Sequence, residues 1–157
     1  MSPSSTTLTL PTLEDTLRLG RELGSRLVPG DLVILSGSLG AGKTALTKGI
    51  AAGMGVTGTV TSPTFVLARI HRGGNGAVPL VHVDAYRLAG SVEIDDLDLD
   101  TDLTAAAVVI EWGEGVADQL SPERLLVALE RLPDDSRVAT LTGIGGDWAR
   151  RIEALSG

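Results

Sequence analysis

Eight consecutive residues, 37–44, have the types and the spacing that polyphosphate binding requires. Their sequence, GSLGAGKT, fits the P-loop pattern G-x-x-x-x-G-K-[ST]. Its three glycines permit backbone dihedrals with which several N–H groups converge on one anion. Lys43 is expected to reach the β- and γ-phosphates, and the Thr44 hydroxyl to ligate Mg²⁺. The residues expected to contact the nucleotide in this segment are Gly37, Ser38, Leu39, Gly40, Ala41, Gly42, Lys43, Thr44 and Ala45.

The segments on either side of this motif are those that a P-loop needs. Residues 32–35 (LVIL) predict a buried strand, and residues 43–52 predict a helix that Gly53 and Gly55 end. The helix would add the partial positive charge of its N-terminus to the anion site. The alternative is a glycine-rich turn that ends in Lys-Thr by chance, and in a chain of this composition such a match has a probability of roughly half a per cent.

Two further strands are expected to end on a carboxylate. Residues 80–84 (LVHVD) end on Asp84, and residues 108–111 (VVIE) end on Glu111. Mg²⁺ accepts one direct protein carboxylate together with waters, so one acid could serve the metal and the other the attacking water. Which acid has which role stays open, and either could simply cap a turn.

Other polar residues near these strands carry weaker signals. Thr64, in the sequence SPTF, follows the P-loop helix at the place where a loop can sense a γ-phosphate. We expect His82 to be a half-buried strand residue rather than a catalytic base, and His71 to face solvent. Arg87 could offset phosphoryl charge or form an ordinary ion pair.

Six acidic residues between positions 93 and 102 could suggest a Ca²⁺ site. The glycine and glutamate spacing of an EF-hand loop is missing. A solvated helix or an acidic edge that faces a partner is the better interpretation.

The order of elements predicts the fold. Thr12 has the position of an N-cap, and a helix is expected from there until Pro29-Gly30 stops it. Turn residues at 73–76 and 133–136 predict two hairpins, and Asp147 could cap a last helix. Further strands are expected at residues 7–10, 66–70, 78–83, 105–110, 125–132 and 138–142. The prediction is an α/β, three-layer P-loop NTPase-like fold with a mixed sheet flanked by helices: one domain over residues 1–157, with residues 1–6 as a flexible tail.

Composition excludes several classes of protein. The chain has 157 residues, no cysteine and a formal net charge of -7, from 20 acidic and 13 basic side chains. Thiolate metal sites, thiol nucleophiles and disulfides are therefore absent. No apolar run has the length of a membrane span, and residues 1–10 lack the basic front of a signal peptide. The acidic excess weighs against a wide basic face that would grip nucleic acid directly.

Taken together, SGSLGAGKT, TSPTF, VHVDAYRL and VVIEWGE resemble, in order and spacing, the bacterial TsaE family, the small ATPase of tRNA threonylcarbamoyladenosine biosynthesis. The resemblance implies a cytoplasmic protein that binds ATP and Mg²⁺ and works with TsaB and TsaD. In that family the threonylcarbamoyl group is installed on adenosine 37 of tRNAs that read ANN codons; the group transfer belongs to TsaD, and ATP hydrolysis supports turnover of the partner complex. Contact with tRNA would be indirect, through the complex, and no membrane would be involved.

The same resemblance implies residue roles. Lys43 would bind phosphates, Thr44 and Glu111 would hold Mg²⁺, and Thr64 would belong to the nucleotide-sensing loop. Asp84 would act near the γ-phosphate, on water. Trp112 would be the aromatic residue after the acid, Thr12 would lie near the adenine, and Arg137 would lie close to the nucleotide. Ser38 stands where many relatives have Asp, so any role of that acid is lost while the backbone nest remains.

Three other functions share some of these sequence features. A small-molecule kinase would share the P-loop, but few arginines are available for a lid that closes over the phosphates. A nucleotide-gated binding module would use γ-phosphate sensing itself as its output. A GTPase is disfavoured, because Asp-x-x-Gly is missing and the sole asparagine, Asn75, lies in a glycine turn.

Overall fold

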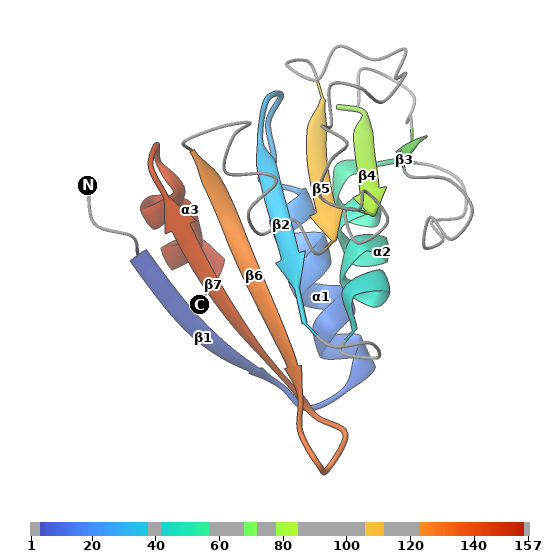
Figure 1. Ribbon diagram of the computed structural model, residues 1–157, viewed down its shortest axis with the longest axis vertical. Helices are drawn as coiled ribbons and strands as arrows, with labels where there is room; N and C mark the ends of the chain where they lie inside the picture. Colours follow the sequence, from blue (N-terminus) through green and yellow to red (C-terminus); the bar gives the residue numbers. More distant parts are fainter. Residues whose placement is uncertain are drawn as a thin grey trace.

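The structure is a computed structural model that describes residues 4–37, 42–56, 68–71, 78–84, 106–111 and 123–155. Along the chain two strand–helix units come first, five strands follow, and one helix ends the series (Figure 1). They are β1 (Ser4–Leu10), α1 (Leu13–Gly24), β2 (Leu32–Ser36), α2 (Lys43–Met54), β3 (Ala68–His71), β4 (Leu80–Asp84), β5 (Ala107–Glu111), β6 (Arg124–Arg131), β7 (Arg137–Ile144) and α3 (Trp148–Leu155).

The strands of the described residues form one seven-stranded sheet in the order β1-β7-β6-β2-β5-β4-β3. The central strand β2 pairs in parallel with β5 and β6, and β4 pairs in parallel with β5. The pairs β3–β4, β6–β7 and β1–β7 are antiparallel. The predicted mixed sheet and both predicted strand pairs are thereby confirmed, and the connecting residues 73–76 of the first hairpin lie outside the described residues.

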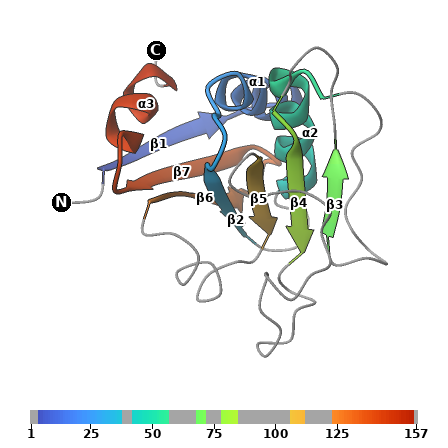
Figure 2. The same cartoon turned by 90° about the horizontal axis from the view of Figure 1, so that it is seen from above.

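Helices α1, α2 and α3 all lie on one face of this sheet (Figures 1 and 2). One continuous core lies between them and the sheet. It includes Leu23 of α1 and Ile50 of α2 as well as Trp148 and Ile152 of α3. The described part of the chain thus contains a sheet layer and one helical layer of the predicted α/β fold. None of the described helices is long and apolar enough to cross a membrane.

Helix α1 begins where its capping residue predicts. Thr12 accepts a hydrogen bond from the backbone N–H of Asp15, and the Asp15 carboxylate accepts one from the backbone N–H of Thr12. The Thr12 hydroxyl also donates to this carboxylate, and its hydrogen bond together with that of the Thr12 backbone N–H holds the pKa of Asp15 below its usual value. The helix ends at Gly24, earlier than the predicted stop at Pro29-Gly30, and its last turn is capped by the backbone N–H of Ser25.

Glycines set how closely α1 and α2 approach. Each helix carries two of them four residues apart, Gly20 and Gly24 in α1 and Gly49 and Gly53 in α2. A Cβ on Gly24 would lie 2.1 Å from the carbonyl oxygen of Ile50, so the backbones themselves are in contact. The prediction that Gly53 helps to end α2 is wrong, because Gly53 lies inside the helix at this contact. Gly55, with a φ of 76°, is the C-cap.

Strand β1 is longer than predicted. It begins at Ser4 rather than at residue 7, and its first residues pair in register with Gly143, Thr142 and Leu141 of β7. Residues 4–6 are therefore part of the sheet and not of a flexible tail, because an antiparallel neighbour of equal reach is available to satisfy their backbone groups. Residues 1–3 lie outside the described part of the chain.

Candidate functional site

The phosphate-binding turn starts at the end of β2 and finishes at the start of α2. Gly37 has a φ of 144° and Gly42 a φ of 108°, values that residues with a side chain rarely adopt. Both glycines of the motif that the structure describes therefore use the backbone freedom for which the pattern requires them. The four residues between them, 38–41, lie outside the described residues.

The first turn of α2 has backbone N–H groups that no side chain of the N-cap residue caps. Gly42 is its N-cap and offers no side chain to the helix end, and the first intrahelical bond runs from Leu46 N–H to the Gly42 carbonyl. The N–H groups of Lys43, Thr44 and Ala45 precede that bond, so the helix itself provides them with no acceptor. Such an uncapped N-terminus is suited to binding phosphate oxygens.

Lys43 is held at this turn. Its side chain is buried, and its Nζ donates a hydrogen bond to the carbonyl oxygen of Gly37, 2.6 Å away. The Lys43 side chain therefore reaches from the start of α2 back to Gly37, the first residue of the motif. This places the ammonium group of the motif's lysine next to Gly37, at the end of β2.

The two residues that carry the candidate carboxylates, Asp84 and Glu111, are paired in register. In the parallel sheet Glu111 pairs with Leu35 of β2 on one side and with Asp84 of β4 on the other. Leu35 lies two residues before Gly37, so the strand ends that carry the acids meet the strand end that leads into the P-loop. The structure thus brings Lys43, Glu111 and the backbone of Asp84 to one edge of the sheet.

Glu111 has a partner that the sequence did not indicate. Oε2 of Glu111 lies 3.0 Å from Nε2 of His82, and both side chains are almost fully buried. The prediction that His82 is half-buried is wrong, because His82 has an exposed fraction of zero. Its place in the strand was predicted correctly, but the neighbouring strand β5 and the helices that cover it could not be inferred from an isolated strand.

The donors present fit Mg²⁺. A hydroxyl on Thr44, which is partly exposed, and a carboxylate on Glu111 are hard oxygen ligands, and Mg²⁺ in nucleotide sites keeps several waters and phosphate oxygens besides. Among the described residues no group of three or more His, Asp or Glu side chains could hold a metal by itself. The chemistry therefore fits a cation that arrives with a nucleotide rather than a closed protein cage.

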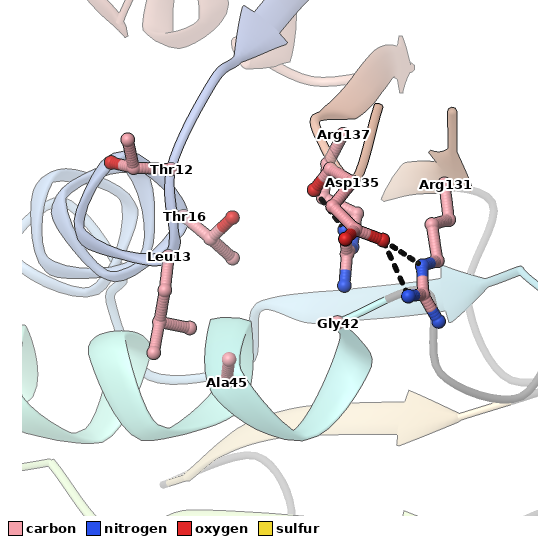
Figure 3. A pocket seen from close by; sticks show the side chains of 8 residues that line it. All are labelled: Thr12, Leu13, Thr16, Gly42, Ala45, Arg131, Asp135 and Arg137. Atoms are coloured by element: carbon pink, nitrogen blue, oxygen red, sulfur yellow. Dashed lines mark hydrogen bonds and ion pairs between the residues drawn. The ribbon is translucent and has the colours of Figure 1, made fainter. Parts of the chain in front are cut away.

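A pocket of about 310 Å³ opens beside the P-loop helix (Figure 3). It lies between the start of α1, the start of α2 and the β6–β7 hairpin, and its lining residues are Thr12, Leu13, Thr16, Gly42, Ala45, Arg131, Asp135 and Arg137. Thr12 and Arg137, which only the family resemblance had connected with a nucleotide, thus share this pocket with Gly42. Nε of Arg137 is 3.8 Å from where a Cβ of Gly42 would lie.

Sequence reasoning missed half of this pocket's lining, namely Leu13, Thr16, Arg131 and Asp135. Asp135, at a φ of 70°, turns the hairpin and accepts hydrogen bonds from Arg131, with 3.0 Å between Nε and Oδ1. Arg137 donates to the carbonyl oxygen of Asp135. The hydrogen bond and charge of Arg131 hold the pKa of Asp135 below its usual value. The sequence indicated a turn at residues 133–136, but only the family resemblance at Arg137 indicated that this turn lies near the P-loop.

Several predicted residues lie outside the described part of the chain. They include the nucleotide-sensing Thr64, the P-loop residues Ser38, Leu39, Gly40 and Ala41, and Arg87, Trp112 and the acidic run from 93 to 102. For Asp84 and His71 only the strand backbone is described.

Comparison with known proteins gives a consistent result. Residues 10–139 match the family described as "Threonylcarbamoyl adenosine biosynthesis protein TsaE". A protein of Mycobacterium bovis named tRNA threonylcarbamoyladenosine biosynthesis protein TsaE is 57% identical over 142 residues, which cover 85% of this chain and 84% of that one. A protein of the same name from Streptomyces coelicolor is 52% identical over 145 residues, covering 88% and 98%. The crystal structure of Bacillus subtilis YdiB superposes with a TM-score of 0.79 at 31% identity and covers 99% of this chain and 97% of its own.

Proposed function

The chain belongs to the TsaE family, and from this premise we propose that it is a Mg²⁺-dependent ATPase that acts with TsaB and TsaD. In this proposal it binds and hydrolyses ATP in support of the threonylcarbamoylation of adenosine 37 in tRNAs that read ANN codons. The relatives are named for threonylcarbamoyladenosine biosynthesis, and the fold is that of P-loop NTPases. The observation that carries the proposal is the convergence of Lys43, the uncapped start of α2 and Glu111 at one sheet edge.

The phosphates would bind over the start of α2. Lys43 would exchange the Gly37 carbonyl for β- and γ-phosphate oxygens, and the N–H groups of the first helical turn would bind further oxygens. Thr44 and Glu111 would hold Mg²⁺, which supplies neutralisation of phosphate charge when bound. Asp84, in register with Glu111, would orient the attacking water.

The adenosine would occupy the pocket between α1, α2 and the β6–β7 hairpin. Gly42 lines this pocket, so the nucleoside part of a nucleotide whose phosphates bind to the P-loop would be able to reach it. Leu13, 65% exposed, offers apolar surface for a base, while Thr12 and Arg137 offer polar groups. Thr64 would belong to a loop that senses the γ-phosphate.

The remaining features of the proposal follow from the sequence and the family. A net charge of -7 favours indirect contact with tRNA through the partner complex over direct binding of the phosphate backbone. We place the protein in the cytoplasm and treat residues 1–157 as one ATPase domain.

The experiment that tests the proposal measures ATP hydrolysis by the purified protein alone, with TsaB and TsaD, and with individual metabolites. The expected result is slow hydrolysis alone and a clear increase only when both partners are present. Stimulation by one metabolite without partners would instead support a small-molecule kinase. An Asp84→Ala variant that binds ATP, cannot hydrolyse it and still gives full multi-turnover support would favour a nucleotide-gated binding module.

A further inference from the structure

His82 and Glu111 form a buried polar pair between the neighbouring strands β4 and β5. His82 lies in β4 and Glu111 in β5, and the side chains of both are at most 5% exposed. Because a carboxylate oxygen can only accept, Nε2–H of His82 donates to Oε2 of Glu111 across 3.0 Å. Nδ1 of the same ring has no hydrogen-bond partner among the described residues. This agrees with a neutral ring that carries its hydrogen on Nε2 and none on Nδ1.

The pair faces the helical layer that carries the P-loop helix. Side chains alternate along a strand, so His82 shares its face with Leu80, and Glu111 shares its face with Val109. Leu80 and Val109 belong to the core cluster that also contains Leu46 and Ile50 of α2. Glu111 is thus directed to the side of the sheet on which α2 begins at Lys43.

A structural role alone does not explain this pair. Burying a carboxylate and an imidazole removes both from water, and well-packed apolar residues of similar volume are often neutral or stabilising in such a place. The surrounding strand positions, such as Val81, Ile110 and Val109, are filled by apolar residues in this way. The hydrogen bond does something that an apolar pair cannot: it fixes one oxygen of Glu111 and with it the plane of the carboxylate.

We propose that His82 is a positioning residue for Glu111, holding the carboxylate in the orientation in which it binds the Mg²⁺ of a Mg-nucleotide. This inference rests on the proposed function, in which Glu111 is a metal ligand. Groups that hydrogen-bond a ligating side chain orient it, and their loss costs about 10–100-fold in metal affinity. His82 itself touches neither metal nor nucleotide in this account.

The test compares three replacements of His82 in the full-length protein, with a fluorescent ATP analogue as the probe. His82→Gln keeps an N–H donor where Nε2 lies, His82→Asn places its donor too far back to reach Glu111, and His82→Leu has none. Val81→Ala, at an equally buried site on the other face of β4, controls for general loss of packing. Nucleotide affinity is measured in EDTA and over a Mg²⁺ titration. Glu111→Gln shows how large the effect on the Mg²⁺ dependence is when the ligating carboxylate itself is lost.

The expected result is that His82→Leu and His82→Asn raise the Mg²⁺ concentration for half-maximal effect by about tenfold or more. Affinity in EDTA should stay within about twofold of wild type, and His82→Gln should restore most of the Mg²⁺ effect. The positioning role would be overturned if His82→Asn left the Mg²⁺ dependence of nucleotide affinity unchanged. It would also be overturned if His82→Asn lowered nucleotide affinity equally with and without Mg²⁺, as expected for a general packing defect such as Val81→Ala. Either result would leave the proposed function untouched. Should His82→Leu fail to fold, the contrast between Gln and Asn decides. A wild-type protein that binds no nucleotide would overturn the proposed function as well.

Discussion

Nζ of Lys43 lies 2.6 Å from the carbonyl oxygen of Gly37, so the last part of the P-loop is tied to its first residue by the side chain that should bind phosphate. The hydrogen bond holds the ammonium group beside Gly37, at the end of β2. A phosphate oxygen that replaces this carbonyl finds the charge already in place.

Removing that ammonium should therefore weaken nucleotide binding. A hydrogen bond to a charged group contributes about 1.5–3 kcal/mol, so Lys43→Ala should lower ATP affinity by about 10–100-fold in isothermal titration calorimetry. Lys48→Ala is the matched control, since Lys48 is the only other lysine and is exposed on the same helix. Equal affinities of the two variants would contradict the role of Lys43.

The pocket beside α2 should select for the nucleoside part of ATP. Ala45→Leu adds bulk to the pocket wall and should weaken ATP binding by about tenfold while leaving inorganic tripolyphosphate within about twofold, because tripolyphosphate has no base to place there. Both affinities can be measured by competition with a fluorescent ATP analogue. Ala52→Leu, on the exposed side of the same helix, should change neither. An equal loss of affinity for ATP and for tripolyphosphate would show that the pocket does not bind the nucleoside.

The glycine contact between α1 and α2 should resist substitution. In an exposed helix interior Gly→Ala stabilises by about 1 kcal/mol, but a Cβ on Gly24 would lie 2.1 Å from backbone oxygen of Ile50. We expect Gly24→Ala to lower the free energy of unfolding by about 3 kcal/mol in urea denaturation, since the helices must move apart. Glu22→Ala on the exposed face of α1 should stay within about 0.5 kcal/mol. A Gly24→Ala variant as stable as wild type would mean that the helices are not in backbone contact.

An ion pair joins α3 to the start of β2. Arg151 lies 2.6 Å from Oδ2 of Asp31, which also accepts the Val28 N–H, and its guanidinium stacks 4.3 Å from the ring centre of Trp148. Partial burial opposes the charge of Arg151, but its bonds to Asp31 and Asp147 prevail and raise its pKa.

Arg151→Met should therefore leave the buried Asp31 short of a partner and cost about 2 kcal/mol of unfolding free energy. Chemical denaturation measures this cost. Adding Asp31→Asn to the same chain should recover part of the loss, because the unpaired charge is then gone. Arg150→Met, at an exposed position of α3, is the control and should have little effect. Simple additivity of the two changes would argue against a coupled pair.

Local patterns predicted the elements well, because their causes are local. The glycines of the P-loop, the cap at Thr12 and the apolar residues of β2 and β5 each act within a few residues of the chain. The fold class and the two hairpin pairs, β3–β4 and β6–β7, followed from the order of these elements and from the turn residues between them.

Contacts between distant segments were not predictable from the same patterns. The burial of His82 depends on β5 and on the helices above it, and the close approach at Gly53 depends on α1. Thr12 and Arg137 come from opposite ends of the chain, and only the family resemblance linked them before the fold brought them to one pocket. The length of β1 likewise depended on the reach of its partner β7.

The most direct test of the central claim is the number of modified adenosines formed per TsaD in a reconstituted reaction with TsaB, TsaD and tRNA. With the wild-type protein or Lys48→Ala, ATP should sustain many turnovers. Without the protein, or with Lys43→Ala, modification should stop after the first. Equal turnover in all four reactions would contradict the proposal that ATP bound at this P-loop supports the partner complex.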